Sequence, residues 1–89
     1  MTTRHSNQPT DRLLKAWQLI KQRSHFITPA EVAKAAQVNH DVAAEYLREW
    51  LEHGVLEPMP RYPKYVYART MRWRTTAIAR RLNQMSELH

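Results

Sequence analysis

The chain has 89 residues and a formal net charge of +6, from 14 lysines and arginines against 8 aspartates and glutamates. This length predicts one small domain, and the basic balance suits polyanionic partners. The absence of cysteine excludes disulfides, thiolate metal sites and cysteine nucleophiles. No apolar run approaches the roughly 20 residues of a membrane span. Residues 1–9 also lack the apolar core of a signal peptide, so we expect a cytoplasmic protein without membrane contact.

The charges fall into three blocks of alternating sign. Residues 1–38 carry a net charge of +4, residues 39–57 carry −4, and residues 58–89 carry +6. The middle block holds five carboxylates and a single basic residue, Arg48. A negative segment therefore lies between two positive ends.

Residues 1–9 are polar and are predicted to form a disordered tail. Thr10 or Asp11 is suited to cap a first helix that ends near Arg23. Apolar residues recur in it every three or four positions, which is typical of a helix with one buried face. These residues are Leu13, Leu14, Trp17, Leu19 and Ile20.

The second helix has the clearest start in the chain. Thr28 is the predicted N-cap, Pro29 stands at the first helical position, and Glu31 completes a capping box. This helix is short and ends near Ala36, so Gln37 and Val38 form the following turn.

A third helix is predicted to begin after Asn39, whose side chain is suited to cap it. Asp41 in the first turn complements the helix dipole. Gly54, the only glycine, marks the end of this helix, where a left-handed backbone favours a residue without Cβ. The residues expected to face the core are Ala43, Tyr46 or Leu47, Trp50 and Leu51.

A β-hairpin is predicted next, at the edge of the domain. Val55–Glu57 starts a strand and Tyr65–Ala68 is rich in residues that favour the return strand. The connecting segment 58–63 contains three prolines, which remove backbone donors and predict a loop.

The last segment, residues 71–88, is predicted to be a helix. Apolar positions follow a spacing of four and three, with one polar member: Met71, Thr75, Ile78, Leu82 and Met85. This seam has two alternative uses, either pairing two subunits through Ile78, Leu82 and Met85 or packing on the core of its own domain. Trp73 either anchors this helix or lies exposed for a partner.

From Asp11 to Arg69, this order of elements resembles the winged-helix superfamily of DNA-binding domains. The residues that carry the resemblance are the helix start at Thr28–Glu31, the small Ala33 where two helices cross, and the run Leu47–Pro58. The resemblance implies an α+β, mostly helical fold, with a winged helix-turn-helix of three helices and a short β-hairpin wing over residues 10–70. A C-terminal helix over residues 71–89 would follow.

The resemblance also implies a small transcriptional regulator whose third helix enters the major groove of duplex DNA. Positions carried over for this contact are Asn39, His40, Asp41, Val42, Ala44, Glu45 and Arg48. We expect Asn39, His40, Ala44 and Arg48 to contribute limited base recognition. Asp41 and Glu45 depart from the family pattern because phosphates repel carboxylates, although an acid can accept from the amino group of cytosine.

Basic residues outside the third helix are expected to supply the phosphate contacts. In the wing, Arg61 and Lys64 flank Tyr62 and Tyr65. A cationic loop with aromatic side chains is suited to a minor groove or a phosphate backbone. The remaining candidates are Arg69, Arg72 and Arg74 after the wing, and Arg4, Arg12 and Arg23 near the N-terminus.

The chain shows no pattern typical of an enzyme or a cofactor site. The five histidines have no metal-ligand spacing, and one glycine cannot build a glycine-rich phosphate loop. The acidic residues of the third helix follow the spacing of a solvated face: Asp41, Glu45, Glu49 and Glu52. We therefore expect no catalytic residue, metal or cofactor.

Two alternatives to duplex binding stay open. Winged-helix domains also act as adaptors, in which case the acidic face of the third helix would contact a protein. Small accessory proteins of ferrous-iron transport are similar in size and element order, although this chain lacks their cysteines. The second alternative is RNA binding, in which the wing tyrosines would stack on unpaired bases.

Overall fold

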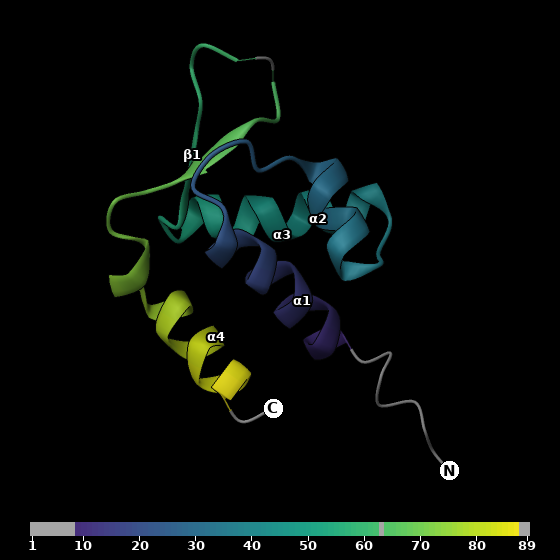
Figure 1. Cartoon of the computed structure of the whole chain (residues 1–89), viewed down its shortest axis with the longest axis vertical. Helices are drawn as coiled ribbons and strands as arrows, with labels where there is room; N and C mark the ends of the chain where they lie inside the picture. The colour runs from purple at the N-terminus through teal and green to yellow at the C-terminus, as the bar shows by residue number, and fades with distance from the viewer. Residues whose placement is uncertain (1–8, 63, 88–89) are drawn as a thin grey trace.

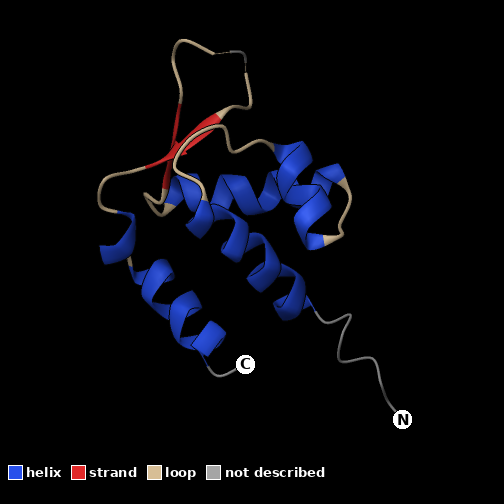
Figure 2. Ribbon diagram, in the orientation of Figure 1, coloured by secondary structure: helices blue, strands red, loops and turns tan. Residues whose placement is uncertain are grey.

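A computed structural model describes residues 9–62 and 64–87 and shows a small, mostly helical α+β fold (Figure 1). Within these residues, four α-helices surround a common core, and one two-stranded antiparallel hairpin projects from it (Figure 2). The elements are α1 (Pro9–Gln22), α2 (Pro29–Ala36), α3 (His40–Glu52), β1 (Leu56–Pro58), β2 (Tyr67–Arg69), the 3-10 helix η2 (Trp73–Thr75) and α4 (Ala77–Glu87).

The first helix begins at Pro9, so the predicted caps Thr10 and Asp11 both lie inside the helix, which starts two or three residues earlier than either cap implies. Proline is well suited to the first turn because its backbone nitrogen needs no hydrogen-bond acceptor there. Pro9 therefore does not belong to the predicted tail, and the rest of that tail lies outside the described residues.

Three tryptophans meet at the centre of the core. Trp17 of α1 is fully buried, with its ring centroid 6.1 Å from that of Trp50 and 5.6 Å from that of Trp73. Trp73 is 8% exposed and so anchors the segment that precedes α4. Aromatic residues bury the largest areas in so short a chain, so this cluster holds α1, α3 and η2 together.

Helix α4 packs on its own domain. The indole Nε1 of Trp17 donates to Oδ1 of Asn83 at 3.0 Å, and Leu82 is 3% exposed within the core. Ile78 and Met85 are half-buried against the same core. The helix was predicted either to pair two subunits or to pack on its own domain, and the structure shows the packing on its own domain. Leu82, expected to pair two subunits, is not available to a partner chain.

The start of the last helix was predicted too early. Thr76 has an extended backbone, and its hydroxyl accepts from the backbone N–H of Ala79 at 3.2 Å, so it caps α4. The predicted seam residues Met71 and Thr75 lie before this cap and are exposed, Met71 at 99%. The apolar spacing alone did not reveal this break, because a threonine N-cap interrupts a helix without interrupting its periodicity.

Both strands lie further along the chain than predicted. Pro58 closes β1 opposite Tyr67. The next bond of the hairpin runs from the N–H of Met59 to the carbonyl of Val66 at 3.0 Å, so Pro58 stands at a non-hydrogen-bonded position and its missing donor costs the ladder no bond. Tyr65 was predicted to begin the return strand, but its φ of +71° places it in a turn. Val55 lies before β1, and its N–H donates to the carbonyl of Trp50 at 2.9 Å, which completes the end of α3.

A pairing that the sequence did not predict ties the hairpin to the α1–α2 connection. Ile27 and Tyr67 exchange two backbone hydrogen bonds of 3.0 and 2.9 Å. Next to them, the N–H of Arg69 donates to the carbonyl of Ser24 at 3.0 Å. Strand β2 is therefore hydrogen-bonded on both of its edges, to β1 on one and to the α1–α2 connection on the other.

The predicted caps of α2 and α3 are confirmed. Thr28 Oγ1 accepts from the N–H of Glu31 at 3.3 Å, and Asn39 Oδ1 accepts from the N–H of Val42 at 2.9 Å. The reciprocal half of the capping box is different from the prediction, because the Glu31 carboxylate pairs with Arg23. This ion pair offsets the charge of one arginine that was expected to face a polyanion.

Replacing Gly54 with alanine is expected to lower the free energy of unfolding by about 1 kcal/mol. Its φ is +80°, and a Cβ there would meet no atom within 4 Å, so backbone strain is the whole cause. Urea unfolding measures the change. Gly54→Asn should lose less, because asparagine tolerates the left-handed region better. An alanine variant as stable as the wild type would contradict this assignment.

Candidate nucleic-acid interface

One edge of α3 and the inner side of the hairpin form a single open groove of about 190 Å³. A second hollow, under the hairpin loop, shares three of its residues and extends the groove toward the loop. We call this surface the α3–hairpin groove and define it by six residues: Ala44, Arg48, Leu51, Lys64, Tyr65 and Tyr67.

The fold therefore brings several predicted contact residues together from distant parts of the chain. Ala44 and Arg48 come from α3, and Tyr62 and Lys64 come from the hairpin loop. Their side chains are exposed, so a ligand in the groove would meet them directly. The Tyr65 side chain is 63% exposed beside them.

The start of α3 offers a ligand fewer unoccupied polar groups than its sequence suggests. The side-chain oxygen of Asn39 is occupied by the helix cap, so only its NH₂ group is left to contact a ligand. His40 and Asp41 are exposed, whereas Val42 is half-buried.

The carboxylates of α3 lie beside the groove rather than in it. Successive residues of a helix are rotated by about 100°. At this rotation, the edge that faces the hairpin carries Ala44, Arg48 and Leu51, and the neighbouring strip is acidic. We call this strip the acidic stripe: Asp41, Glu45, Glu49 and Glu52, all exposed. None of the four lines the groove or the hollow that extends it.

On the far side of the acidic stripe, the next face of α3 lies toward α1. Burial raises the pKa of Tyr46, the nearby charge of Arg12 opposes this rise, and Glu45 and Glu49 add to it. Arg12 thus acts on the α1 side of α3, opposite the edge that faces the hairpin. This basic residue of the N-terminal block does not contribute to the groove.

Arg61 lies on the outer side of the hairpin. It lines a hollow of about 350 Å³ together with Glu57, Pro60 and Tyr62. The Tyr62 ring makes an edge-to-face contact with exposed Phe26, at 5.0 Å between centroids. Arg61 and Lys64, which were predicted to act together, therefore line opposite sides of the loop.

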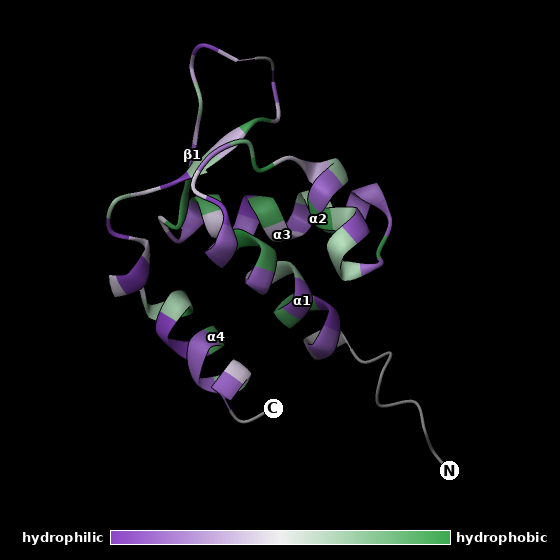
Figure 3. Cartoon of the chain, viewed as in Figure 1, coloured by the Kyte–Doolittle hydropathy of each residue, from purple (hydrophilic) through white to green (hydrophobic). Residues whose placement is uncertain are grey.

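The arginines after the hairpin gather around Trp73 instead. The guanidinium carbons of Arg69 and Arg74 lie 4.7 and 5.3 Å from the centre of its ring. Burial lowers the pKa of Arg69, and the charge of Arg74 lowers it further. Arg72 and Arg74 are exposed on this side of the fold, where hydrophilic residues cover η2 and much of α4 (Figure 3).

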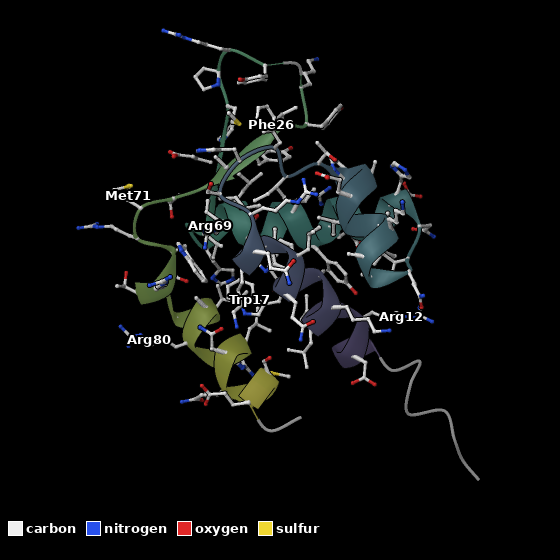
Figure 4. All side chains as sticks on the ribbon, in the orientation of Figure 1. Arg12, Trp17, Phe26, Arg69, Met71 and Arg80 are labelled. Carbon is white, nitrogen blue, oxygen red and sulfur yellow. The ribbon has the colours of Figure 1, made fainter. Side chains whose placement is uncertain are left out.

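Of the basic residues predicted to contact DNA, Arg4 lies outside the described residues, and the described ones fall into separate groups. Arg69 and Arg80 lie on the opposite side of the molecule from Arg12 (Figure 4). None of the three arginines at 69, 72 and 74 lines the α3–hairpin groove. They were expected to contact the duplex together with the wing residues, but they lie outside the groove that Lys64 and Tyr65 line.

Two residues that define the groove, and one more that lines it, were not predicted from the sequence to lie there. Leu51 was expected in the core, and Tyr67 was treated only as a strand residue. Pro29 was interpreted only as a helix start, yet it lines the groove near α3. The spacing of Ala44, Arg48 and Leu51 by four and three was the available signal, because such residues share one side of a helix.

Within residues 9–62 and 64–87, no three histidine or carboxylate side chains come together as a metal-ligand set. In the same part of the chain, no helix combines the length and the apolar character needed to cross a bilayer. Comparison of the chain with protein-family models, with curated proteins and with solved structures finds no match. A functional assignment therefore depends on the surfaces described above.

Proposed function

We propose that this protein is a small winged-helix DNA-binding protein that acts as a transcriptional regulator. In this proposal α3 is the recognition helix and the hairpin is the wing. The observation that supports it most is the α3–hairpin groove, in which Arg48 and Lys64 reach one surface from two elements. A helix edge beside a cationic loop is suited to follow a duplex from its major groove to its backbone.

Each side chain of the groove has a role that follows from its chemistry. Arg48 donates to guanine O6 and N7 or to a phosphate, and His40 and the NH₂ group of Asn39 add polar contacts. Lys64 offers a point charge to the backbone, while Tyr65 supplies a hydroxyl and an exposed ring. Ala44 is small enough to let the helix approach the bases closely.

The acidic stripe limits how the duplex is held. Phosphates that approach Asp41 and Glu45 are repelled, so the duplex is expected to tilt toward the hairpin side of α3. Such a tilt keeps Arg48 in contact and leaves the carboxylates on the solvent side. This tilt also predicts modest affinity for the duplex, because few basic side chains contact the phosphate backbone of the DNA.

The experiment that tests this proposal is a titration of the full chain onto random-sequence duplex DNA at two salt concentrations. We expect non-specific binding in the micromolar range that weakens steeply as salt rises, because phosphate contacts release counterions. A chain that does not bind the duplex at low salt would overturn the proposal.

Glu45→Lys is expected to raise duplex affinity by about three- to tenfold and to steepen its salt dependence by about one unit of slope. The substitution removes a repulsive carboxylate and adds a cation at the border of the groove. Fluorescence anisotropy with labelled duplex measures both quantities. The matched control is Glu57→Lys, which makes the same charge change on the outer side of the hairpin. Equal gains for both variants would show that net charge, not docking on α3, sets the affinity.

A second candidate function is a protein-interaction adaptor. The observation that favours it is the acidic stripe, which has four exposed carboxylates along α3. A basic helix or peptide of a partner protein would complement this stripe. In the salt titration, an adaptor is expected to leave random duplex DNA unbound at both concentrations.

A further inference from the structure

A fourth hollow, of about 390 Å³, lies where the end of α1 meets η2 and α4. Its lining residues are Lys21, Trp73, Arg74, Asn83 and Glu87. None of them lines the α3–hairpin groove or its extension. The duplex-binding proposal therefore leaves this hollow without a role.

The floor of the hollow is held rigidly. Trp73 packs its ring edge-to-face against buried Trp17, at 5.6 Å between centroids. Two threonine hydroxyls fix the surrounding backbone: Thr75 donates to the carbonyl of Arg72, and Thr76 donates to the carbonyl of Trp73, both at 2.8 Å. The floor and the backbone around it therefore need little ordering when a ligand binds.

The orientation of the Asn83 amide follows from its partner. An indole N–H can only donate, so the atom that receives the Trp17 bond is the amide oxygen. This leaves the NH₂ group of Asn83 as a donor. With the ammonium of Lys21 and the guanidinium of Arg74, three donors from three elements line the hollow. Glu87 is the only carboxylate among its lining residues.

Among residues 9–62 and 64–87, no carboxylate forms an ion pair with Arg74, or with Arg69, which contacts the Trp73 ring but does not line the hollow. Both guanidinium groups stack on Trp73, and the Nε of Arg69 is buried without a hydrogen-bond partner among the described residues. The ion pair that is found among the described residues lies away from this hollow and joins Arg23 to Glu31. Two cations held together in this way favour an anion between or beside them.

We propose that this hollow binds a phosphate group through Lys21, Arg74 and the NH₂ group of Asn83. A phosphate offers three or more acceptor oxygens in a tetrahedral arrangement, which suits donors that converge from three elements better than a planar carboxylate does. The group belongs either to a nucleic-acid backbone or to a free phosphorylated small molecule. The site does not depend on duplex binding by the α3–hairpin groove.

The test is a titration of the full chain with inorganic phosphate, followed by NMR of arginine Nε–H and tryptophan indole N–H signals. We expect the signals of Arg74 and Trp73 to shift, whereas the indole of Trp50, buried on the α3 side of the core, stays unchanged. Arg74→Gln and Lys21→Gln should each weaken phosphate binding by about tenfold. The matched control is Arg80→Gln, because Arg80 is exposed on α4 and does not line the hollow.

Asn83→Asp separates the site from the packing of α4. An aspartate keeps an oxygen acceptor for Trp17 but removes the donor and adds a negative charge. We expect at least a tenfold loss of phosphate binding, with the Trp17 indole signal retained. A repeat with random-sequence duplex identifies the source: shifts of the same two signals assign the phosphate to a backbone, and shifts with inorganic phosphate alone assign it to a small molecule. Binding that is unaffected by Arg74→Gln and Lys21→Gln would overturn the proposal, as would the absence of any shift.

Discussion

Replacing Trp17 with alanine is expected to lower the free energy of unfolding by about 3–5 kcal/mol. Trp17 is fully buried, contacts the rings of Trp50 and Trp73, and donates the bond that holds Asn83 of α4. Small domains are stable by only about 5–15 kcal/mol, so this single change removes much of the total. Urea unfolding followed by circular dichroism measures the loss.

Two further variants divide the role of Trp17 into its parts. Trp17→Phe keeps a ring in the core but cannot donate to Asn83, so we expect an intermediate loss. Met71→Ala is the surface control, because Met71 is 99% exposed and its truncation should change stability by less than about 0.5 kcal/mol. A Trp17→Ala variant that loses less than about 1 kcal/mol would show that the tryptophan cluster does not hold the core.

Combining Arg48→Ala with Lys64→Ala is expected to weaken duplex binding by about 30-fold at low salt. These two cations approach the α3–hairpin groove from different elements, so their loss removes both the helix and the wing contact. The slope of log affinity against log salt should fall by nearly two units, because each lost phosphate contact contributes about 0.9.

A charge-matched pair makes this test specific. Arg80→Ala with Arg81→Ala removes the same two charges from exposed positions on α4. We expect this pair to weaken binding by less than about threefold, through long-range electrostatics alone. Equal losses for the two pairs would mean that the duplex follows net charge rather than the groove.

The local part of the fold was predictable from the sequence. Thr28, Asn39 and Gly54 mark helix ends through bonds or backbone angles that involve residues within one or two turns. All the residues that take part in such a helix end lie close together in the sequence, so a short segment is enough to predict it. The positions of α2 and α3 therefore agree with the prediction to within a residue.

The non-local part was not predictable in the same way. The pairing of Ile27 with Tyr67 and the bond from Trp17 to Asn83 join residues far apart in the sequence. Asn83 is not among the predicted seam residues of the last helix, although its side chain meets a buried indole. Tyr65 has good strand propensity, yet the geometry of the loop holds it in a left-handed turn.

For the candidate site too, features set by local spacing were predictable, and features set by the tertiary fold were not. Helical spacing predicted a solvated face for the carboxylates of α3, and all four are exposed, because that spacing is local. The gathering of Arg69 and Arg74 around Trp73, away from Lys64, depends on how the β2–α4 connection folds. A sequence gives the order of charges along the chain but not their separation in space.

The central claim is that α3 and the hairpin form one surface for duplex DNA. Its most direct test is NMR mapping of backbone amides while random-sequence duplex is added to the full chain at low salt. We expect the largest shifts in residues 39–48 and 64–67, and we expect them to disappear as salt rises. Shifts confined to α1 and α4, or no shifts at all, would contradict the claim.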